Sequence, residues 1–306
     1  AHSSIAGPAA ASRLVHTSAQ AGDSAASAPT GPLRVCVVGG GVVGLTCALR
    51  LLQLNQDAAD PTAPTATTAT TTPAPLARPI EVTVLAAGFG ADTTTAGAAG
   101  LWGPYKLSGT EALICRWGSA TYDHLMDLAH SGLAAEAGVS LCAVNSLYPQ
   151  PEELPFWRHI PYNFQLLDDR MLNSVGRVGA PSSSASTSSS ASSSSFATSP
   201  SSSPPSSDPP PLRCRWGYHW NSVVCEGTHY LPFLTAAVET AGGRLQRRRL
   251  AALSELDGGS VDLVVNAAGL GARELLGDGE VYPIRGQILR VRAPWVTQAS
   301  RMRARR

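Results

Sequence analysis

Three glycines, at positions 39, 41 and 44, have a spacing that suits the binding of a dinucleotide's diphosphate. In a strand–turn–helix unit the first glycine permits a tight turn, and the second lets the backbone approach the diphosphate. The third lets the helix pack close to the strand, and the amino end of the helix favours negative charge. The alternative is a plain glycine turn, and the spacing alone does not distinguish NAD from FAD.

A second feature is the segment VTVLAAGFG, residues 82–90, which is typical of a buried strand that runs into a turn. Dinucleotide-binding folds usually end this strand on an Asp or Glu that accepts hydrogen bonds from a ribose of the cofactor. Here Leu85, Ala86, Ala87 and Gly88 carry no carboxylate. The missing acid counts most against NAD, whose ribose depends most on it.

Two loops have the composition of cofactor contacts. Residues 93–105 combine three threonines, small residues and a Trp-Gly-Pro-Tyr corner, so their amides and hydroxyls would line a polar cofactor. Asn266 follows the apolar run LVV at a second strand-to-loop transition. A surface loop and a simple capping role for Asn266 are the alternatives. Trp102 and Tyr105 also suit a hydrophobic core.

The elements that must position these residues alternate along the chain. LRVCVV at 33–38 is typical of a parallel strand covered on both faces, and a helical pattern follows the glycines. The strand IEVTVLA at 80–86 comes after a Thr/Ala/Pro tract at 57–79, which we expect to be a disordered insertion. This strand–helix–strand order predicts an α/β fold.

Composition sets other segments apart. Residues 1–32 are rich in Ala and Ser, which is typical of a disordered leader or an organelle transit peptide. Ser and Pro dominate a second expected insertion at 180–211. The Arg run 247–249 indicates an edge strand with solvated charges rather than an anion-binding patch. After the second tract the pattern predicts, in order, a strand at 216–227, a helix at 230–243, a buried strand at 261–269 and a strand at 285–293.

Charge and composition argue against several classes of protein. Only 15% of residues are charged and the net charge is +1, so no nucleic-acid partner is expected. No apolar stretch approaches the roughly 18 residues of a membrane span. The six cysteines form no C-x-x-C pair, which favours reduced thiols over a disulfide framework or a zinc site. We therefore predict no metal site.

Five segments, taken together, resemble the D-amino-acid oxidase and D-aspartate oxidase family. They are VCVVGGGVVGLTCALRLL, TTTAGAAGLWGPY, CEGTHYLPFL, VVNAAGLGARELLGD and PIRGQILRVRAPW, in the family's order. The resemblance implies a Rossmann-like FAD-binding domain of the glutathione-reductase kind at 33–110 and 226–290. It places part of a β-rich α+β substrate domain at 111–225. Residues 291–306 would be the start of more substrate domain, followed by a tail outside the pattern.

The activity implied by the resemblance is the FAD-dependent oxidative deamination of a D-amino acid. The substrate gives its α-hydrogen to the flavin as hydride, the imino acid hydrolyses to a 2-oxo acid and ammonia, and oxygen accepts the electrons to form hydrogen peroxide. The family suggests a peroxisomal location, with a cytoplasmic or leader-targeted protein as alternatives, and it leaves a homodimer open. A flavin-binding fragment without turnover, or another amine oxidase such as a glycine or sarcosine oxidase, are rival interpretations.

The resemblance also implies which residues contact FAD. They are Gly39, Gly41, Val42, Val43 and Gly44 at the diphosphate; Thr94 and Thr95 beside it; Ala99, Gly100 and Leu101 against the flavin; Leu250 near the adenine; and Asn266, Ala267, Ala268 and Gly269 in a second turn. Arg285 would lie in a turn close to the flavin or form a surface ion pair.

Three features depart from the family. Ala87 and Gly88 replace an acid and an Arg at the adenosine, and Gly103 replaces a Gln near the substrate. The Tyr and Arg residues that clamp the substrate carboxylate would follow Val296, so we expect them, and the end of the fold, to be missing; the catalytic residues stay unassigned.

Overall fold

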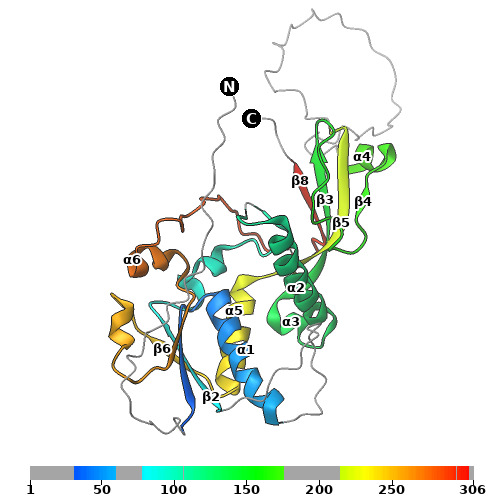
Figure 1. Cartoon of the computed structure of the whole chain (residues 1–306). Coiled ribbons are helices and arrows are strands. Elements are labelled where there is room, and N and C mark those ends of the chain that lie inside the picture. The colour runs from blue at the N-terminus through cyan, green and yellow to red at the C-terminus, as the bar shows by residue number, and fades with distance from the viewer. Residues whose placement is uncertain (1–30, 60–77, 106, 176–213, 294, 303–306) are drawn as a thin grey trace, which may run out of the picture. The chain divides into compact units, whose positions relative to one another are not determined.

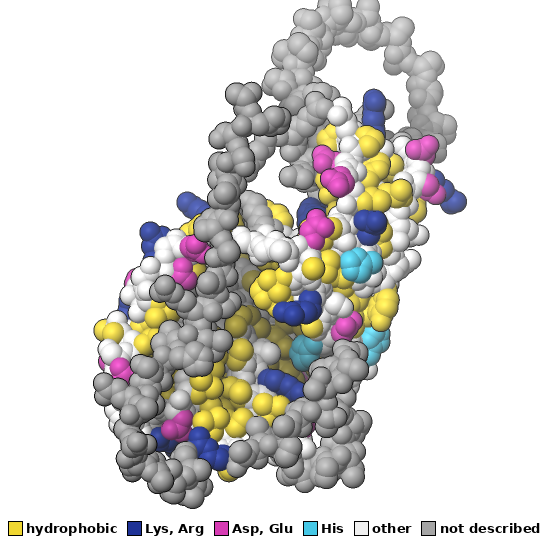
Figure 2. Space-filling view, in the orientation of Figure 1, with side chains coloured by type: hydrophobic (Ala, Val, Ile, Leu, Met, Phe, Trp, Pro, Cys, Tyr) yellow, Lys and Arg dark blue, Asp and Glu magenta, His cyan; other side chains and the backbone are white. Residues whose placement is uncertain are grey.

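The computed structural model describes residues 31–59, 78–105, 107–175, 214–293 and 295–302. The predicted leader, except for residues 31 and 32, lies outside these residues. So do all but the ends of the predicted insertion at 57–79 and the whole of the one at 180–211. No helix among the described residues is long and apolar enough to cross a membrane. On the face seen in Figure 2, Lys and Arg side chains alternate with Asp and Glu and do not gather in one patch.

A four-stranded parallel sheet is built from two separate stretches of the described chain, residues 33–86 and 244–266 (Figure 1). Its strand order is β6-β2-β1-β7, with β1 (Leu33–Val38) and β2 (Ile80–Ala86) in the middle. The edges are β6 (Arg244–Arg247) and β7 (Leu263–Asn266). Register is continuous from Leu33 opposite Ile80 to Val38 opposite Leu85. The α/β prediction is therefore confirmed. The edge-strand prediction for the Arg run holds only for Arg247, because β6 ends there.

Alternation along β1 explains why its run of apolar residues is continuous. Val35 and Val37 face a large core cluster that contains Leu45 and Leu52 of helix α1 (Val42–Ala59) and Leu234 of helix α5 (Gly227–Thr240). Cys36 and Val38 face the other side, where Leu256 of the short helix η3 (Leu253–Leu256) covers them. Both faces are thus covered, as in other parallel sheets.

A second sheet, of order β4-β5-β3-β8, carries a cluster of aromatic residues on β5. β3 (Val139–Tyr148) pairs antiparallel with β5 (Trp216–Cys225), and β4 (Gln165–Leu166) flanks β5. Trp216, Tyr218 and Trp220 alternate along β5, so they share one face. Trp157 packs on that face at ring distances of 5.5 Å from Trp220 and 6.5 Å from Tyr218.

The remaining elements connect and cover these sheets. The short helices η1 (Gly90–Asp92) and η2 (Thr94–Gly97) follow β2, and η4 (Gly269–Gly271) and α6 (Ala272–Leu276) follow β7. Helices α2 (Glu111–His130) and α3 (Ala134–Ala137) precede β3, and α4 (Asp169–Val175) follows β4. Thr110 caps α2 by accepting a hydrogen bond from the Leu113 amide at 3.3 Å.

Three sequence predictions for the C-terminal part are wrong or need correction. Residues 285–293 form no strand: Leu289 and Val291 are largely exposed, and no strand of the described chain pairs with them. A strand needs such a partner for its backbone groups. The run at 261–269 was expected to be buried, but β7 is short and lies at the sheet edge. In the tail, β8 (Gln298–Met302) pairs parallel with β3, although this segment was expected to stand outside the fold's pattern.

An ion pair joins β1 to the start of β7 and gives a pH-dependent contribution to stability. Arg34 donates to Asp262 from its backbone amide and from its guanidinium, each at 2.8 Å. These bonds lower the pKa of Asp262 from 3.8 to about 2. A carboxylate with a lowered folded-state pKa stabilises the protein above its unfolded pKa, and the contribution is lost as pH falls through the folded value.

Asp262→Asn is therefore expected to lower the free energy of unfolding at neutral pH, with the difference from the unmodified protein shrinking between about pH 4 and pH 2. Urea unfolding across this pH range measures it. Asp127→Asn, an exposed position on α2, is the control. A difference that stays constant down to pH 2 would contradict the assigned role of the Arg34 pair.

Candidate functional site

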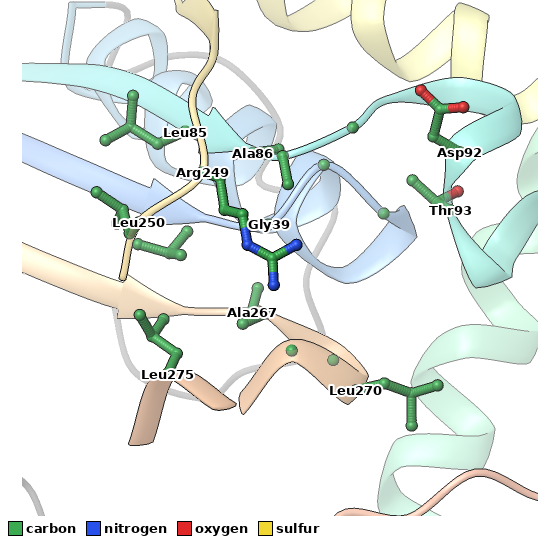
Figure 3. Close-up of a pocket in the computed structure, with 18 of the residues that line it drawn as sticks. Gly39, Leu85, Ala86, Asp92, Thr93, Arg249, Leu250, Ala267, Leu270 and Leu275 are labelled. Atoms are coloured by element: carbon green, nitrogen blue, oxygen red, sulfur yellow. The ribbon is translucent and has the colours of Figure 1, made fainter. Parts of the chain in front are cut away.

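A cavity of about 720 Å³ opens at the carboxyl ends of the parallel strands (Figure 3). In open α/β sheets this is the edge at which ligands bind. Its walls come from the loops after β1, β2, β6 and β7. The lining residues are 38–43, 85–88, 92–95, 248–251, 267–271, 274 and 275.

The glycine turn between β1 and α1 forms one wall and is tightly packed. Gly39 has a φ of +130°, and a Cβ there would lie 2.1 Å from the carbonyl oxygen of Ala267. A Cβ on Gly44 would lie 1.9 Å from the carbonyl oxygen of Gly39. Both positions therefore require glycine, the first for the turn and the second for the close approach of helix to loop.

Gly41 differs because it faces the cavity. A Cβ there would meet only Thr95 Oγ1, at 3.2 Å, so the missing side chain leaves space at the amino end of α1. Thr95 accepts a hydrogen bond from the Val42 amide at 3.2 Å and so joins the loop after β2 to the helix. Val43 and Thr94 also line the cavity. An anion placed here would meet amides and a helix amino end, which is the chemistry a diphosphate needs.

The other predicted contact residues divide into two groups. Leu250, Ala267, Ala268 and Gly269 line the cavity. Asn266 does not: its side-chain oxygen accepts a hydrogen bond from the Ala268 amide at 3.2 Å, which is the capping role given above as its alternative. The segment 99–101 also lies outside the lining.

Residues 99–101 instead join the second sheet. The Cys225 amide donates to the Gly100 carbonyl at 2.9 Å, and Leu101 forms a bridge with Val224. Trp102 is a core residue, 7% exposed, whose indole N–H donates to the Gly118 carbonyl at 3.1 Å. Arg285 is exposed and does not line the cavity.

The family of FAD dependent oxidoreductases that includes D-amino-acid oxidases matches residues 34–305. The chain belongs to this family. Human D-aspartate oxidase is 29% identical over 266 residues, and D-amino-acid oxidase of Rubrobacter xylanophilus is 30% identical over 264. These matches cover 86% and 85% of this chain but only 61% and 60% of the relatives' lengths. The family match ends at residue 305, so it includes the residues after Val296 that were expected to depart from the family's pattern.

Glycine oxidase from Geobacillus kaustophilus has a similar fold, with a TM-score of 0.50 at 17% identity. That match covers 79% of this chain and 57% of the glycine oxidase chain. The Rossmann-like fold predicted from the sequence is thus confirmed, and FAD is the cofactor of the family.

The carboxyl end of β2 brings no charged side chain to the cavity. Leu85, Ala86, Ala87 and Gly88 all line the cavity, so this strand end carries no acid, as the sequence indicated. Charged side chains reach the cavity from other elements. They are Asp92 of η1, Arg248 and Arg249 after β6, and Glu274 of α6.

The two arginines that line the cavity have carboxylate partners that differ in how firmly they are held. Arg248 donates to Glu255 at 2.8 Å, and Glu255 also accepts from the amides of Ala251 and Ala252. These backbone bonds, together with Arg248, lower the pKa of Glu255. Arg249 donates to Glu274 at 2.5 Å, and both side chains are about three-quarters exposed. The sequence contained a signal for these residues, the Arg run, but the prediction of an edge strand is wrong for Arg248 and Arg249, which follow β6 and line the cavity.

Proposed function

We propose that this chain forms the FAD-binding part of an oxidase that deaminates D-amino acids to 2-oxo acids, ammonia and hydrogen peroxide. The observation that carries the proposal is the cavity at the carboxyl ends of the sheet, closed by the glycine turn, in a member of an FAD-dependent family. The names of the two relatives, D-aspartate oxidase and D-amino-acid oxidase, support the substrate class.

In this proposal Gly39, Gly41 and Gly44, with the first turn of α1 at Val42 and Val43, bind the diphosphate. Thr94 and Thr95 approach it from the loop after β2. Leu250 contacts the adenine end, and Ala268 and Gly269 belong to the second turn beside the cofactor. Ala99, Gly100 and Leu101 keep their assignment near the flavin, on a segment that pairs with β5 rather than lining the cavity.

Bound FAD would accept a hydride from the substrate and pass the electrons to oxygen. The residues of this chain would contribute binding and orientation, because the α1 amino end and the Thr95 loop fix the diphosphate and hence the position of the ring. The groups that bind the substrate carboxylate stay unassigned. For this reason the second candidate function is FAD binding without turnover.

The test uses the purified chain with added FAD, followed by a visible flavin spectrum and a peroxide assay. We expect a bound flavin band, and peroxide with D-Ala or D-Asp but not with L-Asp. Peroxide with glycine or sarcosine alone would favour another amine oxidase. A bound flavin that gives no peroxide with any amino acid would favour the second candidate. A protein that stays colourless in FAD would contradict both.

Ala87 offers a direct test of where the adenosine lies. Ala87→Glu or Ala87→Asp restores a carboxylate at the end of β2, where it would accept a ribose hydroxyl. One charge-assisted hydrogen bond of this kind is expected to tighten FAD binding about tenfold, measured by flavin fluorescence. Ala135→Glu on α3 adds the same charge at an exposed position outside the cavity lining. An unchanged affinity at Ala87 would mean that the ribose lies elsewhere.

A peroxisomal or cytoplasmic location and a homodimer belong to the same proposal. They are suggested by the family and depend on the whole protein. The D-amino acid and oxygen are the proposed small-molecule partners.

A further inference from the structure

The cavity contains a cation and a carboxylate that have no part in the proposed binding of the diphosphate at the glycine turn. Arg249 and Glu274 both line it and form an ion pair, with Nη2 of Arg249 2.5 Å from Oε2 of Glu274. They come from opposite edges of the sheet. Arg249 follows β6, whereas Glu274 lies on α6, which follows β7. The pair therefore spans the carboxyl ends of the two central strands.

The orientation of Arg249 places it over the ligand space. In Figure 3 its side chain extends from the segment after β6 into the cavity, between Leu250 and Gly39 in this view. The carboxyl end of β2, with Ala86 labelled, lies on the same side of the cavity and presents only apolar groups. Arg249 and its partner are thus charged groups that a nucleotide would meet at this end, next to the paired Arg248.

The other ion pairs near the cavity are held differently. Arg248 is held by Glu255, which two backbone amides also bind. Asp92 is bound by Arg247 at 2.9 Å. Asp92 packs beside Gly88, where a Cβ would lie 2.6 Å from the Cβ of Asp92. In Figure 3 the Asp92 carboxylate points away from the centre of the cavity. The side chains of Glu274 and Arg249 have only each other as partners among the hydrogen bonds and ion pairs of the described residues. Replacing this exposed ion pair by contacts with a ligand therefore costs the least.

We propose that Arg249 and Glu274 bind the adenosine part of the cofactor in place of the acid that β2 lacks. Glu274 accepts hydrogen bonds from the ribose hydroxyls, and the planar guanidinium of Arg249 covers the adenine ring. The ion pair holds both side chains at the cavity mouth before the nucleotide enters. This inference rests on the proposed function, because it assumes that the cavity takes FAD.

The experiment compares three ligands on the full chain. FAD and ADP contain adenosine, whereas FMN does not. Arg249→Gln and Glu274→Gln are each expected to weaken FAD and ADP binding about tenfold or more, as loss of a charge-assisted contact predicts, and to leave FMN binding within about a factor of two. Binding is followed by flavin fluorescence for FAD and FMN and by calorimetry for ADP. Arg50→Gln, in an exposed ion pair on α1, is the matched control.

A double variant separates ligand contact from a structural role. R249E/E274R keeps an ion pair across the cavity but exchanges the two ends. We expect it to melt like the unmodified protein and to bind FAD as weakly as the single variants. Recovery of FAD affinity in this variant, or full affinity in both single variants, would overturn the inference and leave the proposed function standing. Failure of the unmodified chain to bind FAD or ADP would instead contradict the proposed function, and this inference with it.

Discussion

Gly44→Ala is expected to remove measurable FAD binding, with an affinity loss of at least about a hundredfold. The added Cβ would lie 1.9 Å from the carbonyl oxygen of Gly39, a backbone atom that no side-chain rotation can move away. The glycine turn and the first turn of α1 would have to separate. That movement displaces Gly41 and the Val42 amide, which the Thr95 hydroxyl binds at 3.2 Å. Overpacking of this kind also costs about 1–3 kcal/mol of stability.

The control for Gly44 is a glycine in another helix. Gly118 lies within α2, where a Cβ would make ordinary contact with Ile160 at 3.4 Å. Gly118→Ala is expected to keep FAD affinity and to raise the free energy of unfolding by about 0.5–1 kcal/mol, because alanine has the higher helix propensity. Flavin fluorescence and thermal unfolding of both variants provide the comparison. If Gly44→Ala binds FAD like the unmodified protein, the diphosphate does not lie on this turn.

Local patterns in the sequence were sufficient to predict the parallel sheet and its glycine turn. The β-branched runs at 33–38 and 80–86 have side chains that suit both covered faces, and this information is contained within each segment. The glycine spacing predicts a tight turn at Gly39 and close packing at Gly44. Both are confirmed, by the positive φ of Gly39 and by the short distance from a Cβ on Gly44 to the carbonyl oxygen of Gly39.

Long-range arrangement explains what the sequence could not predict. Arg249 and Glu274 meet because β6 and β7 are the two edges of one sheet, and no local pattern encodes that order. The segment 285–293 has the alternation of a strand but pairs with no strand of the described chain. Leu263 of β7 is 46% exposed because an edge strand of four residues is covered less than a central one.

Gly100→Ala is the second change for which we expect a large effect, this time on the connection between the first loop and the second sheet. Gly100 has a φ of +71°, and a Cβ there would lie 1.9 Å from the carbonyl oxygen of Cys225. The same two residues share a hydrogen bond, from the Cys225 amide to the Gly100 carbonyl, at 2.9 Å. The substitution therefore combines backbone strain with a clash that breaks the pairing of residues 100 and 101 with β5.

A matched glycine separates these two costs. Gly259 has the same φ of +71°, but nothing lies within 4 Å of a Cβ built there. Gly259→Ala is expected to lose only the strain of the left-handed conformation, about 1–2 kcal/mol. Gly100→Ala adds the overpacking cost of about 1–3 kcal/mol, and more if Cys225 cannot shift. Urea unfolding of the two variants measures the difference directly. Equal losses would show that the loop moves away from β5 freely, and residues 99–101 could then reach a bound flavin without breaking any fixed contact. A larger loss of stability for Gly100→Ala would show that pairing with β5 fixes this loop. Residues 99–101 would then contact the flavin only if it binds next to the loop in its present position.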